Sequence, residues 1–574
     1  MDKHDVSAIL EEIGSILDIK GENTFKCRAY HNAARTIEGV QEDLKVLVAS
    51  ARIKEIPGIG SGLADKITEL VQTGKLAYYE ELKSSLPPGL LEMMRIQGVG
   101  PKKVKALYEK LGIKSIFSLE KACKENRLLD VEGFGAKTQE NILKGIAYLR
   151  KNQGQFRIDV ATAEAQRMLE EIKKVKGVLR ATIGGSIRRR KEIVRDIDIL
   201  VSSKSAGPAI MDRFVKLPGV ERVLAHGETK SSVLLESGIQ TDLRVVTDAE
   251  YPFALHYFTG NKEHNIAMRG RAQDKGMKLN EYGLFHIKGK KETPIACKDE
   301  AGIFKKLGLD FIVPELREDD GEIAAAEKHA LPDLITPKQI RGIFHVHSVY
   351  SDGKARIPDI ARRALELGLE YLGMSDHSPY AAYANGLKPD RLKKQQAEID
   401  SVGKDFPKLK LLKGSEVDIL PDGSLDYDEK TLSGFDFVIA SVHSNFNLSE
   451  KEQTARIIKA IKNKHTTILG HPTGRLILAR EPYAVNLKEV IDAAADYGKI
   501  VELNASPHRL DLDWRMCRYA KQKGVMLSIN PDAHSLEGLE DTPYGVGIAR
   551  KGWLGPADIF NALPFASIMK RLHA

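Results

Sequence analysis

The sequence predicts a multidomain protein with an all-α N-terminal part, an α+β middle part and a C-terminal barrel of parallel strands. In the first 150 residues, apolar side chains recur at helical spacing, as in Val6, Ile9 and Ile13. Strand-like apolar runs begin later, at residues 181–183 and 197–201. After residue 338, short apolar runs alternate with helical stretches in what we read as seven βα units. Such alternation is typical of parallel strands that close into a barrel.

The composition excludes several classes of protein. With 574 residues, the chain is long enough for several domains with their own apolar cores. Its four cysteines form no C-x-x-C pair, so we expect a reduced, cytoplasmic setting and no thiolate zinc site. We find no signal-peptide layout, and no apolar run approaches the about 20 residues that span a bilayer, so no membrane partner is expected. The net charge of +8 permits a polyanionic partner without requiring one.

A short glycine pattern occurs three times in the helical part. Residues 56–60 (IPGIG) recur as IQGVG at 96–100 and as VEGFG at 131–135, which resembles the helix-hairpin-helix motif. Glycines permit a tight turn, and main-chain N–H groups of the following helix can then hold a phosphate oxygen. One copy would equally fit a plain helix–helix turn, but three copies favour DNA binding that ignores base sequence. The expected DNA-binding glycines are Gly58, Gly60, Gly98, Gly100, Gly133 and Gly135.

Carboxylates gather on two strand-like runs of the middle part. Asp196 and Asp198 alternate along one strand, so both face the same side, and Asp242 on another run adds a third. Three carboxylates can hold two hard cations that clamp an in-line phosphoryl displacement. The preceding turn at Gly185 and Ser186 can cradle phosphates with main-chain amides and one hydroxyl. Taken alone, this pattern also leaves antibiotic- or RNA-modifying transferases open.

Further motifs narrow this choice. Residues 257–260 read YFTG, and the glycine repeats precede them. With these motifs, residues 1 to about 318 resemble the family X DNA polymerases and their DNA polymerase beta-like core. The resemblance implies a nucleotidyltransferase palm in which Asp196, Asp198 and Asp242 bind Mg²⁺ or Mn²⁺, with Asp242 helping to activate the primer 3′-hydroxyl.

The same resemblance implies how deoxynucleoside triphosphates are bound. The residues it assigns to the nucleotide, the nascent base pair and the template are Gly185, Ser186, Arg189, Arg157, Tyr257, Phe258, Gly260, Asn265 and Arg269. Lys262 departs from the beta enzyme, which has an acidic residue there, and is expected to alter nucleotide affinity.

Lys66 marks a third site. In the beta enzyme, which this part resembles, the matching lysine forms a Schiff base with a deoxyribose phosphate and eliminates it. Tyr30 and Lys26 also match residues of that pocket, whereas Gly62 replaces one of its basic residues. Lyase activity and a simple phosphate contact therefore both remain open for Lys66.

Histidines gather in the last part of the chain. Of the 16 histidines, nine follow residue 338, and six of these stand beside acids at predicted strand ends. Barrel enzymes place their chemistry at the carboxyl ends of strands, and a shell of imidazoles and carboxylates suits Zn²⁺, Mn²⁺ or Fe²⁺. The nine expected ligands suit two or three ions, with Glu416 as a bridge; they are His345, His347, Asp352, His377, Glu416, His443, His471, Asp532 and His534.

This order of ligands resembles the PHP (polymerase and histidinol phosphatase) family, a distorted (β/α)7 barrel, over residues 339–574. The H-x-H opening, the Asp-His pair at 376–377 and the closing Asp-x-His all match, and no expected ligand is missing. The resemblance implies metal-dependent phosphoester hydrolysis by an activated water. Arg475 and Arg480 can hold substrate phosphates or simply lie on a solvated face. A structural barrel and a small-molecule phosphatase stay open as alternatives.

These assignments predict the organisation of the chain. The expected parts are a helical DNA-binding or lyase-like domain at 1–88, fingers at 89–150, a palm at 151–248, a thumb at 249–318, a charged linker at 319–338 and the PHP domain at 339–574. The expected function is gap-filling repair synthesis on gapped or primed DNA, coupled to a 3′–5′ exonuclease or phosphoesterase activity. Abasic-site processing in base excision repair stays open, and we expect a monomer.

Overall fold

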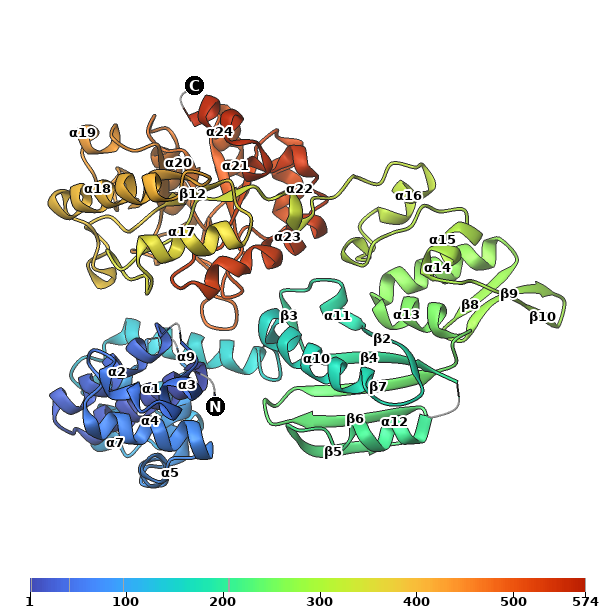
Figure 1. Ribbon diagram of the computed structural model, residues 1–574, viewed down its shortest axis with the longest axis horizontal. Helices are drawn as coiled ribbons and strands as arrows, with labels where there is room; N and C mark the ends of the chain where they lie inside the picture. Colours follow the sequence, from blue (N-terminus) through green and yellow to red (C-terminus); the bar gives the residue numbers. More distant parts are fainter. Residues whose placement is uncertain (2, 41, 97, 205–206, 573–574) are drawn as a thin grey trace. The chain divides into compact units, whose positions relative to one another are not determined.

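The computed structural model describes the chain except residues 2, 41, 97, 205–206 and 573–574. It comprises two compact units, Met1–Gln153 and Gly154–Ala574, each described here by itself (Figure 1). None of the helices in the described part combines the length and apolar character that crossing a membrane requires.

The described residues of the first unit fold into helices, as the apolar spacing predicts (Figure 1). Its helices are α1 (Lys3–Lys20), α2 (Thr24–Glu38), α3 (Leu44–Ala49), α4 (Ser61–Thr73), α5 (Ala77–Ser84), α6 (Pro88–Met93), α7 (Pro101–Leu111), α8 (Ile116–Lys124) and α9 (Ala136–Lys151). One apolar core runs from Val6 in α1 to Ile146 in α9. The predicted N-terminal and finger domains therefore share a core, and residue 88 does not separate two packing units.

The palm opens the second unit with a mixed sheet in the order β2-β4-β7-β6-β5. Its elements are β1 (Phe156–Arg157), α10 (Ile158–Lys173), β2 (Val178–Ile183), α11 (Gly185–Arg188), β3 (Ile193–Val194), β4 (Asp196–Ser203), α12 (Gly207–Phe214), β5 (Val220–His226), β6 (Lys230–Leu235) and β7 (Gln240–Val246). Ile197, Ile199 and Val201 of β4 pack in one core with α10 and α12. Because side chains alternate along a strand, Asp196 and Asp198 face the opposite side of the sheet.

The thumb follows the palm. Its elements are α13 (Tyr251–Thr259), α14 (Lys262–Asp274), β8 (Met277–Asn280), β9 (Gly283–Lys288), β10 (Lys291–Ile295) and α15 (Glu300–Lys306). A core around Phe304 and Met268 joins these helices to the hairpin.

The segment 319–338 is packed, which corrects its interpretation as a charged linker. It contains α16 (Glu322–Glu327), whose Glu322 carboxylate is buried 2.6 Å from the His264 ring. Leu334 packs in the thumb core, and Ile335 packs in the core of the following barrel. The many charged side chains of this segment are paired or exposed, and the few apolar side chains between them are enough to pack it on the two cores.

The last part is a barrel of parallel strands in the order β11-β12-β13-β14-β15-β16-β17. Its strands are β11 (Gly342–Ile343), β12 (Tyr371–Met374), β13 (Lys410–Asp418), β14 (Phe437–Ser441), β15 (Ile468–Leu469), β16 (Ile500–Asn504) and β17 (Leu527–Asn530). Its helices are α17 (Ile357–Glu366), α18 (Pro389–Asp405), α19 (Glu429–Leu432), α20 (Glu450–Ile461), α21 (Leu487–Asp496), α22 (Trp514–Gln522), α23 (Thr542–Lys551) and α24 (Phe565–Leu572). Main-chain hydrogen bonds of Ala533 with His345 and His347, at 3.1 and 2.9 Å, close the ring, as the predicted (β/α)7 barrel requires.

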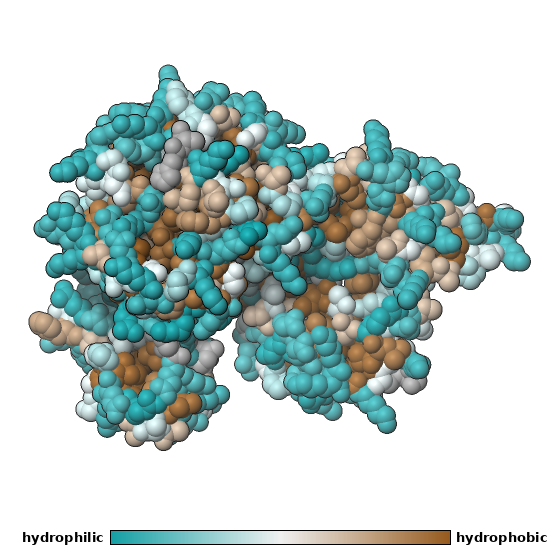
Figure 2. All heavy atoms as spheres, turned by 45° about the horizontal axis from the view of Figure 1, so that its top comes forward, coloured by the Kyte–Doolittle hydropathy of each residue, from teal (hydrophilic) through white to brown (hydrophobic). Residues whose placement is uncertain are grey.

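Apolar side chains fill the interior of the barrel toward the amino ends of its strands. Phe344, Phe437, Ile439 and Ile500 belong to one buried cluster. On β16, Glu502 lies two residues beyond Ile500 and so points into the same interior, nearer the carboxyl ends of the strands. The face shown in Figure 2 is mostly hydrophilic, with apolar residues in separate small patches.

Candidate functional site

Three carboxylates lie together on the palm sheet. β4 and β7 run parallel, and Asp198 stands directly opposite Asp242 in their register. Asp196, two residues before Asp198, shares their face of the sheet. The structure therefore brings together the three predicted ligands of the polymerase metals.

The charges of this cluster disturb one another. Burial, then the charges of Asp196 and Asp242, raise the pKa of Asp198 to about 7. Burial and the charge of Asp242 also raise the pKa of Asp196. Burial raises the pKa of Asp242 too, but hydrogen bonds, led by that of Lys230 at 2.6 Å, outweigh it and leave the pKa below its usual range. Cations bound here would replace this repulsion with attraction.

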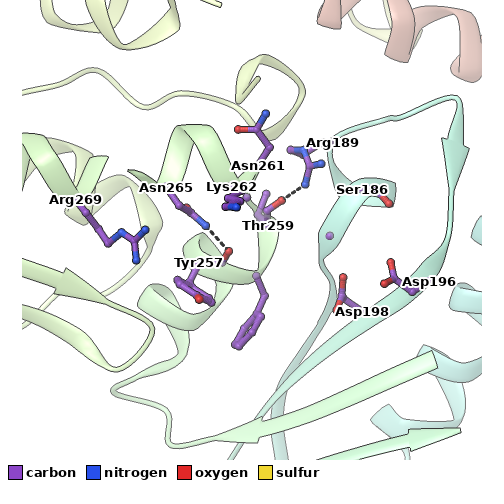
Figure 3. A pocket seen from close by; sticks show the side chains of 13 residues that line it. Ser186, Arg189, Asp196, Asp198, Tyr257, Thr259, Asn261, Lys262, Asn265 and Arg269 are labelled. Atoms are coloured by element: carbon purple, nitrogen blue, oxygen red, sulfur yellow. Dashed lines mark hydrogen bonds between the residues drawn. The ribbon is translucent and has the colours of Figure 1, made fainter. Parts of the chain in front are cut away.

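A pocket of about 380 Å³ opens beside the carboxylates (Figure 3). Its walls come from α11 and β4 on one side and from α13 and α14 on the other (Figure 3). The lining residues are Gly185, Ser186, Arg189, Asp196, Asp198, Tyr257, Phe258, Thr259, Gly260, Asn261, Lys262, Asn265 and Arg269. All predicted nucleotide-binding residues except Arg157 thus line one pocket.

Individual contacts explain parts of this geometry. Gly185 has φ of 58°, and a Cβ atom there would lie 2.2 Å from an Asp198 carboxylate oxygen, so only glycine fits. Asn265 donates its amide to the Tyr257 carbonyl at 2.8 Å, which ties α14 to the end of α13. Arg189 donates to the Thr259 carbonyl, and its Nε lies 3.2 Å from Glu318.

Several basic residues of the palm form ion pairs with acids of the protein. Arg157 is absent from the described lining of the pocket, and its guanidinium instead forms a bidentate pair with Asp159 at 2.8 and 3.1 Å. In the run 188–191, Arg188 pairs with Glu300 at 3.0 Å and Lys191 with Glu318 at 3.0 Å. The sequence could not reveal these carboxylates, because the thumb supplies two of the three.

The three glycine motifs adopt one geometry. The first glycines, Gly58, Gly98 and Gly133, have φ of 86°, 79° and 86°. The second glycines directly precede α4, α7 and α9 without a side-chain cap, and all six glycines are exposed. Between them, Ile59, Val99 and Phe134 are buried and anchor each turn. Each motif therefore presents uncapped N–H groups to solvent, as a phosphate contact requires.

We predict that DNA affinity falls steeply with salt and depends little on base sequence. The exposed Lys102 lies in the first turn of α7. Its replacement with alanine should reduce the magnitude of the slope of log K against log salt by about 0.9, because one counterion fewer is released on binding. Fluorescence anisotropy over a salt series measures it, with Lys110→Ala at the far end of α7 as the matched control. A shallow slope with strong sequence preference would contradict phosphate-based binding.

Lys66 lies in a basic, aromatic corner of the first unit. Its ammonium lies 5.0 Å from the centroid of the Tyr78 ring, and that of Lys26 lies 6.0 Å from the same ring. Tyr30 stacks on Tyr78 with ring centroids 6.3 Å apart. The structure brings the predicted residues Lys66, Lys26 and Tyr30 together and adds Tyr78, which the sequence reading missed.

We expect borohydride to trap a covalent adduct between the protein and a 5′-deoxyribose phosphate, and Lys66→Ala to lose it. The reason is that an amine must attack the sugar aldehyde to form a reducible Schiff base. Gel electrophoresis of the trapped product measures the adduct, and Lys26→Ala, which leaves the nucleophile in place, is the control. No adduct with the wild-type protein at saturating DNA would leave Lys66 as a phosphate contact.

The carboxyl ends of the barrel strands carry a cluster of histidines and acids. Among the described residues, four groups of side chains place their ligand atoms within 4.8 Å of one another, and together they include all nine predicted ligands. The groups are His347–Asp352–His377–His534, His345–His471–Asp532, His345–His347–Glu416 and His377–Glu416–His443. Glu416, buried at 1% exposure, belongs to two of them, as do His345, His347 and His377, but its two oxygens face different rings: Oε2 lies 3.3 Å from His345, and Oε1 lies 3.2 and 2.9 Å from His443 and His471.

The buried nitrogens of this cluster fit bound cations. Among the described residues, His345 Nε2, both ring nitrogens of His347 and His377 Nδ1 are buried without a hydrogen-bond partner. Such atoms are costly to bury unless something binds them. Burial, then the charges of His534 and His377, lower the pKa of His347 to about 3, which leaves it neutral and able to ligate.

Two acids that were not predicted from the sequence contact the histidine rings of the cluster at their outer nitrogens. Glu502 accepts from His345 Nδ1 at 2.7 Å and from the main-chain N–H of His471 at 2.8 Å. Asp418 lies 3.2 Å from His443 Nδ1. A carboxylate on the outer nitrogen fixes the ring and its tautomer, so that the other nitrogen faces an ion. Their positions inside strands, two residues beyond Ile500 and Glu416, were a usable signal.

Other side chains near the cluster differ from expectation. Asp376 of the predicted Asp-His pair accepts from Ser348, Ser351 and Gln395 and so supports the loops rather than joining the ligands. Arg475 binds main-chain carbonyls of residues 509 and 510 and lies 3.3 Å from Glu192 of the palm, so it does not serve the cluster.

Arg480 donates to the Gly474 carbonyl at 2.6 and 2.9 Å. The arginine that does reach the ligands is Arg509, 3.1 Å from Asp532, with a buried Nη1 that has no hydrogen-bond partner in the described structure.

Comparisons with protein families agree with this division. Residues 1–76 match a helix-hairpin-helix domain, and residues 90–147 match a SAM-like helix-hairpin-helix tandem. Residues 254–318 match the DNA polymerase beta thumb, and residues 344–506 match the PHP domain.

Individual relatives cover the chain to different extents. The chain is 37% identical over 565 residues to the DNA polymerase/3′-5′ exonuclease PolX of Bacillus subtilis, with 98% of each protein covered. About a third of the chain is similar to probable phosphatases. That of Thermoanaerobacter sp. is 34% identical over 77% of its length, and that of Caldanaerobacter subterraneus is 31% identical over 74%.

Proposed function

The chain belongs to family X of the DNA polymerases and carries a C-terminal PHP domain, and from this premise we propose that it fills gaps in DNA and removes nucleotides from 3′ ends. The observation that carries the proposal is that one chain contains two clusters of side chains suited to bind metal ions. One cluster lies beside a pocket of nucleotide size, and the other lies at the mouth of the barrel.

In the proposed polymerase site, Asp196, Asp198 and Asp242 hold Mg²⁺ or Mn²⁺. When bound, such ions would supply positive charge against the transferred phosphoryl group. Asp242 also faces the primer 3′-hydroxyl, and Ser186 and Arg189 bind the triphosphate. The remaining wall of the pocket, α13 and α14, meets the sugar and the nascent base pair through Tyr257, Phe258, Gly260, Asn265 and Arg269.

In the proposed hydrolytic site, the nine barrel residues would hold two or three Zn²⁺, Mn²⁺ or Fe²⁺ ions, which would supply an activated water and a charge to polarise the phosphodiester. Glu416 would be the bridging ligand between two of these ions. Arg509 would bind a non-bridging phosphate oxygen, because its Nη1 is buried without a partner in the described structure. Glu502 and Asp418 keep the histidine rings in place.

The helix-hairpin-helix unit would hold the DNA on either side of a gap through its phosphates. We also propose that the protein acts as a monomer on gapped or primed DNA, with deoxynucleoside triphosphates as substrates. Its location would be cytoplasmic, in keeping with four free cysteines.

The test is incubation with a duplex that has a one-nucleotide gap, with deoxynucleoside triphosphates and Mg²⁺ or Mn²⁺. Denaturing gels with the label on the primer resolve extension from shortening. The proposal expects extension by one nucleotide when the triphosphates are present and stepwise 3′ shortening when they are left out. Primer that stays unchanged under both conditions would refute it.

A second candidate for the barrel is a small-molecule phosphatase, because the probable phosphatases are similar over a third of the chain. Comparing a phosphate monoester with a single-stranded oligonucleotide as substrates separates the two functions. Faster turnover of the monoester would favour the phosphatase.

A further inference from the structure

The segment after α11 lies between the nucleotide pocket and the barrel. It runs from Arg189, which lines the pocket, to Glu192, and each of its residues contacts the PHP domain. Lys551 Nζ lies 3.2 Å from the Arg189 carbonyl, and the Arg190 side chain packs against Gly547. The Lys191 ammonium lies 5.9 Å from the centroid of the Trp514 ring, and Glu192 lies 3.3 Å from Arg475. The segment that carries Arg189 into the nucleotide pocket therefore packs against the barrel.

Lys551, the last residue of α23, is the innermost of these contacts. Its side chain is 0% exposed, and its ammonium is paired with the Glu318 carboxylate. It also lies 3.5 Å from the Glu315 carbonyl and 5.2 Å from the centroid of the Trp514 ring. A fully buried lysine is rare, because its charge must be matched by partners to offset the loss of water.

Glu318 connects Lys551 to the pocket. Its side chain is 7% exposed and lies 3.2 Å from Arg189 Nε, 3.0 Å from Lys191 Nζ and 3.3 Å from Asn261 Nδ2. Burial opposes its charge, but Lys551, Lys191 and Arg189 outweigh burial and lower the pKa of Glu318 to about 2. One carboxylate therefore fixes two pocket residues, Arg189 and Asn261, and is itself fixed by the barrel.

The backbone conformation of the segment also depends on the barrel. Arg190 has φ of 54°, a left-handed conformation that side chains other than glycine rarely adopt. A Cβ atom on Gly547 would lie 3.1 Å from Arg190 Cγ, so the side chain lies flat against α23. Strained backbone persists where the surroundings hold it in several ways, and here α23 supplies that hold.

We propose that Lys551 of the PHP domain is a positioning residue of the polymerase, holding Glu318 and the main chain of Arg189 so that the Arg189 guanidinium faces the incoming triphosphate. This inference rests on the proposed role of Arg189. A guanidinium fixed before the nucleotide arrives binds it more tightly, because the ordering cost is met in folding. Lys551 itself does not touch substrate.

The experiment measures steady-state incorporation on a gapped duplex with the full chain. Lys551→Met, which keeps the volume but removes the charge, is expected to raise the KM for the nucleotide about tenfold, with kcat changed less than about threefold. Lys551→Arg, which keeps the charge, is expected to recover at least half of this loss on a logarithmic scale. Hydrolysis by the barrel should stay unchanged in both, because Lys551 lies outside the ligand cluster.

The matched control is Arg518→Ala, which removes a half-exposed contact of the barrel with Asp320 at 3.0 Å outside the Glu318 cluster. Its KM should equal that of the wild type. If Lys551→Met does not fold, as judged by circular dichroism, Lys551→Gln replaces it and is expected to raise the KM as well.

A KM within twofold of the wild type in the folded variant would overturn the inference. An arginine variant as defective as the methionine variant, or an equal rise in Arg518→Ala, would also overturn it in favour of general packing. A wild-type protein that incorporates no nucleotide would instead refute the proposed polymerase function.

Discussion

Replacing Asp198 with alanine is expected to abolish nucleotide incorporation, with a fall in rate of about 10³-fold or more, because a ligand of the catalytic metals is lost. Asp198 stands between Asp196 on its own strand and Asp242 on the next, so it is central to the carboxylate cluster. Primer extension under single-turnover conditions measures the loss. Shortening of the primer by the barrel should persist at its wild-type rate.

Asp198→Asn separates lost chemistry from lost folding. The raised pKa of Asp198, about 7 in the folded chain, means that the folded state holds its proton more tightly than the unfolded state. The free energy of unfolding therefore falls as pH rises from about 4 to 7, and this loss of stability is complete above that range. Without metal at pH 8, the asparagine variant should be more stable by about 2 kcal/mol while incorporating no nucleotide. An inactive variant that is also less stable would point to a structural role.

Replacing Glu416 with alanine is expected to abolish hydrolysis, by about 10³-fold or more, and to lower the metal content by more than one ion per chain. Glu416 belongs to two of the ligand groups and is almost fully buried, so its loss disturbs more than one ion. Elemental analysis of the purified full chain and an assay of 3′ shortening measure the two effects.

Two further variants serve as controls for this prediction. Glu429→Ala removes an exposed carboxylate paired with Lys464 in the same domain and should change neither metal content nor activity. Arg475→Ala should leave the metal content intact, because Arg475 binds carbonyls and Glu192 rather than the ligands. A Glu416 variant that keeps its full metal content would show that this carboxylate bridges no ions.

The candidate ligands could be brought together from the sequence because local rules place them. Asp196 and Asp198 follow the two-residue period of a strand, and Asp242 comes from a strand run of its own. The barrel ligands were predictable because parallel strands bring their carboxyl ends to one edge. Register was not predictable, although it is the pairing of Asp198 with Asp242 that makes the palm cluster.

Long-range partners could not be predicted from the sequence. Arg157 and Arg475 had plausible partners in phosphates, yet the fold pairs them with Asp159 and with main-chain carbonyls. Lys551 carries no local sign of its role, because Glu318 lies in another domain. The packing of segment 319–338 could not be predicted for the same reason, since its apolar side chains pack on two different cores.

The way the barrel closes has a consequence for the lifetime of the protein. Its first and last strands meet through contacts such as that of the Phe344 N–H with Asn530 Oδ1 at 3.2 Å, between residues 186 positions apart. Contacts between such distant residues form slowly, so ring closure is a late step of folding. Ions held between His345 on one side of the seam and Asp532 on the other would have to leave, or lose ligands, before the seam reopens. Such ions would slow unfolding more than they speed folding, and depletion of metal would shorten the survival of the protein during heat or proteolysis.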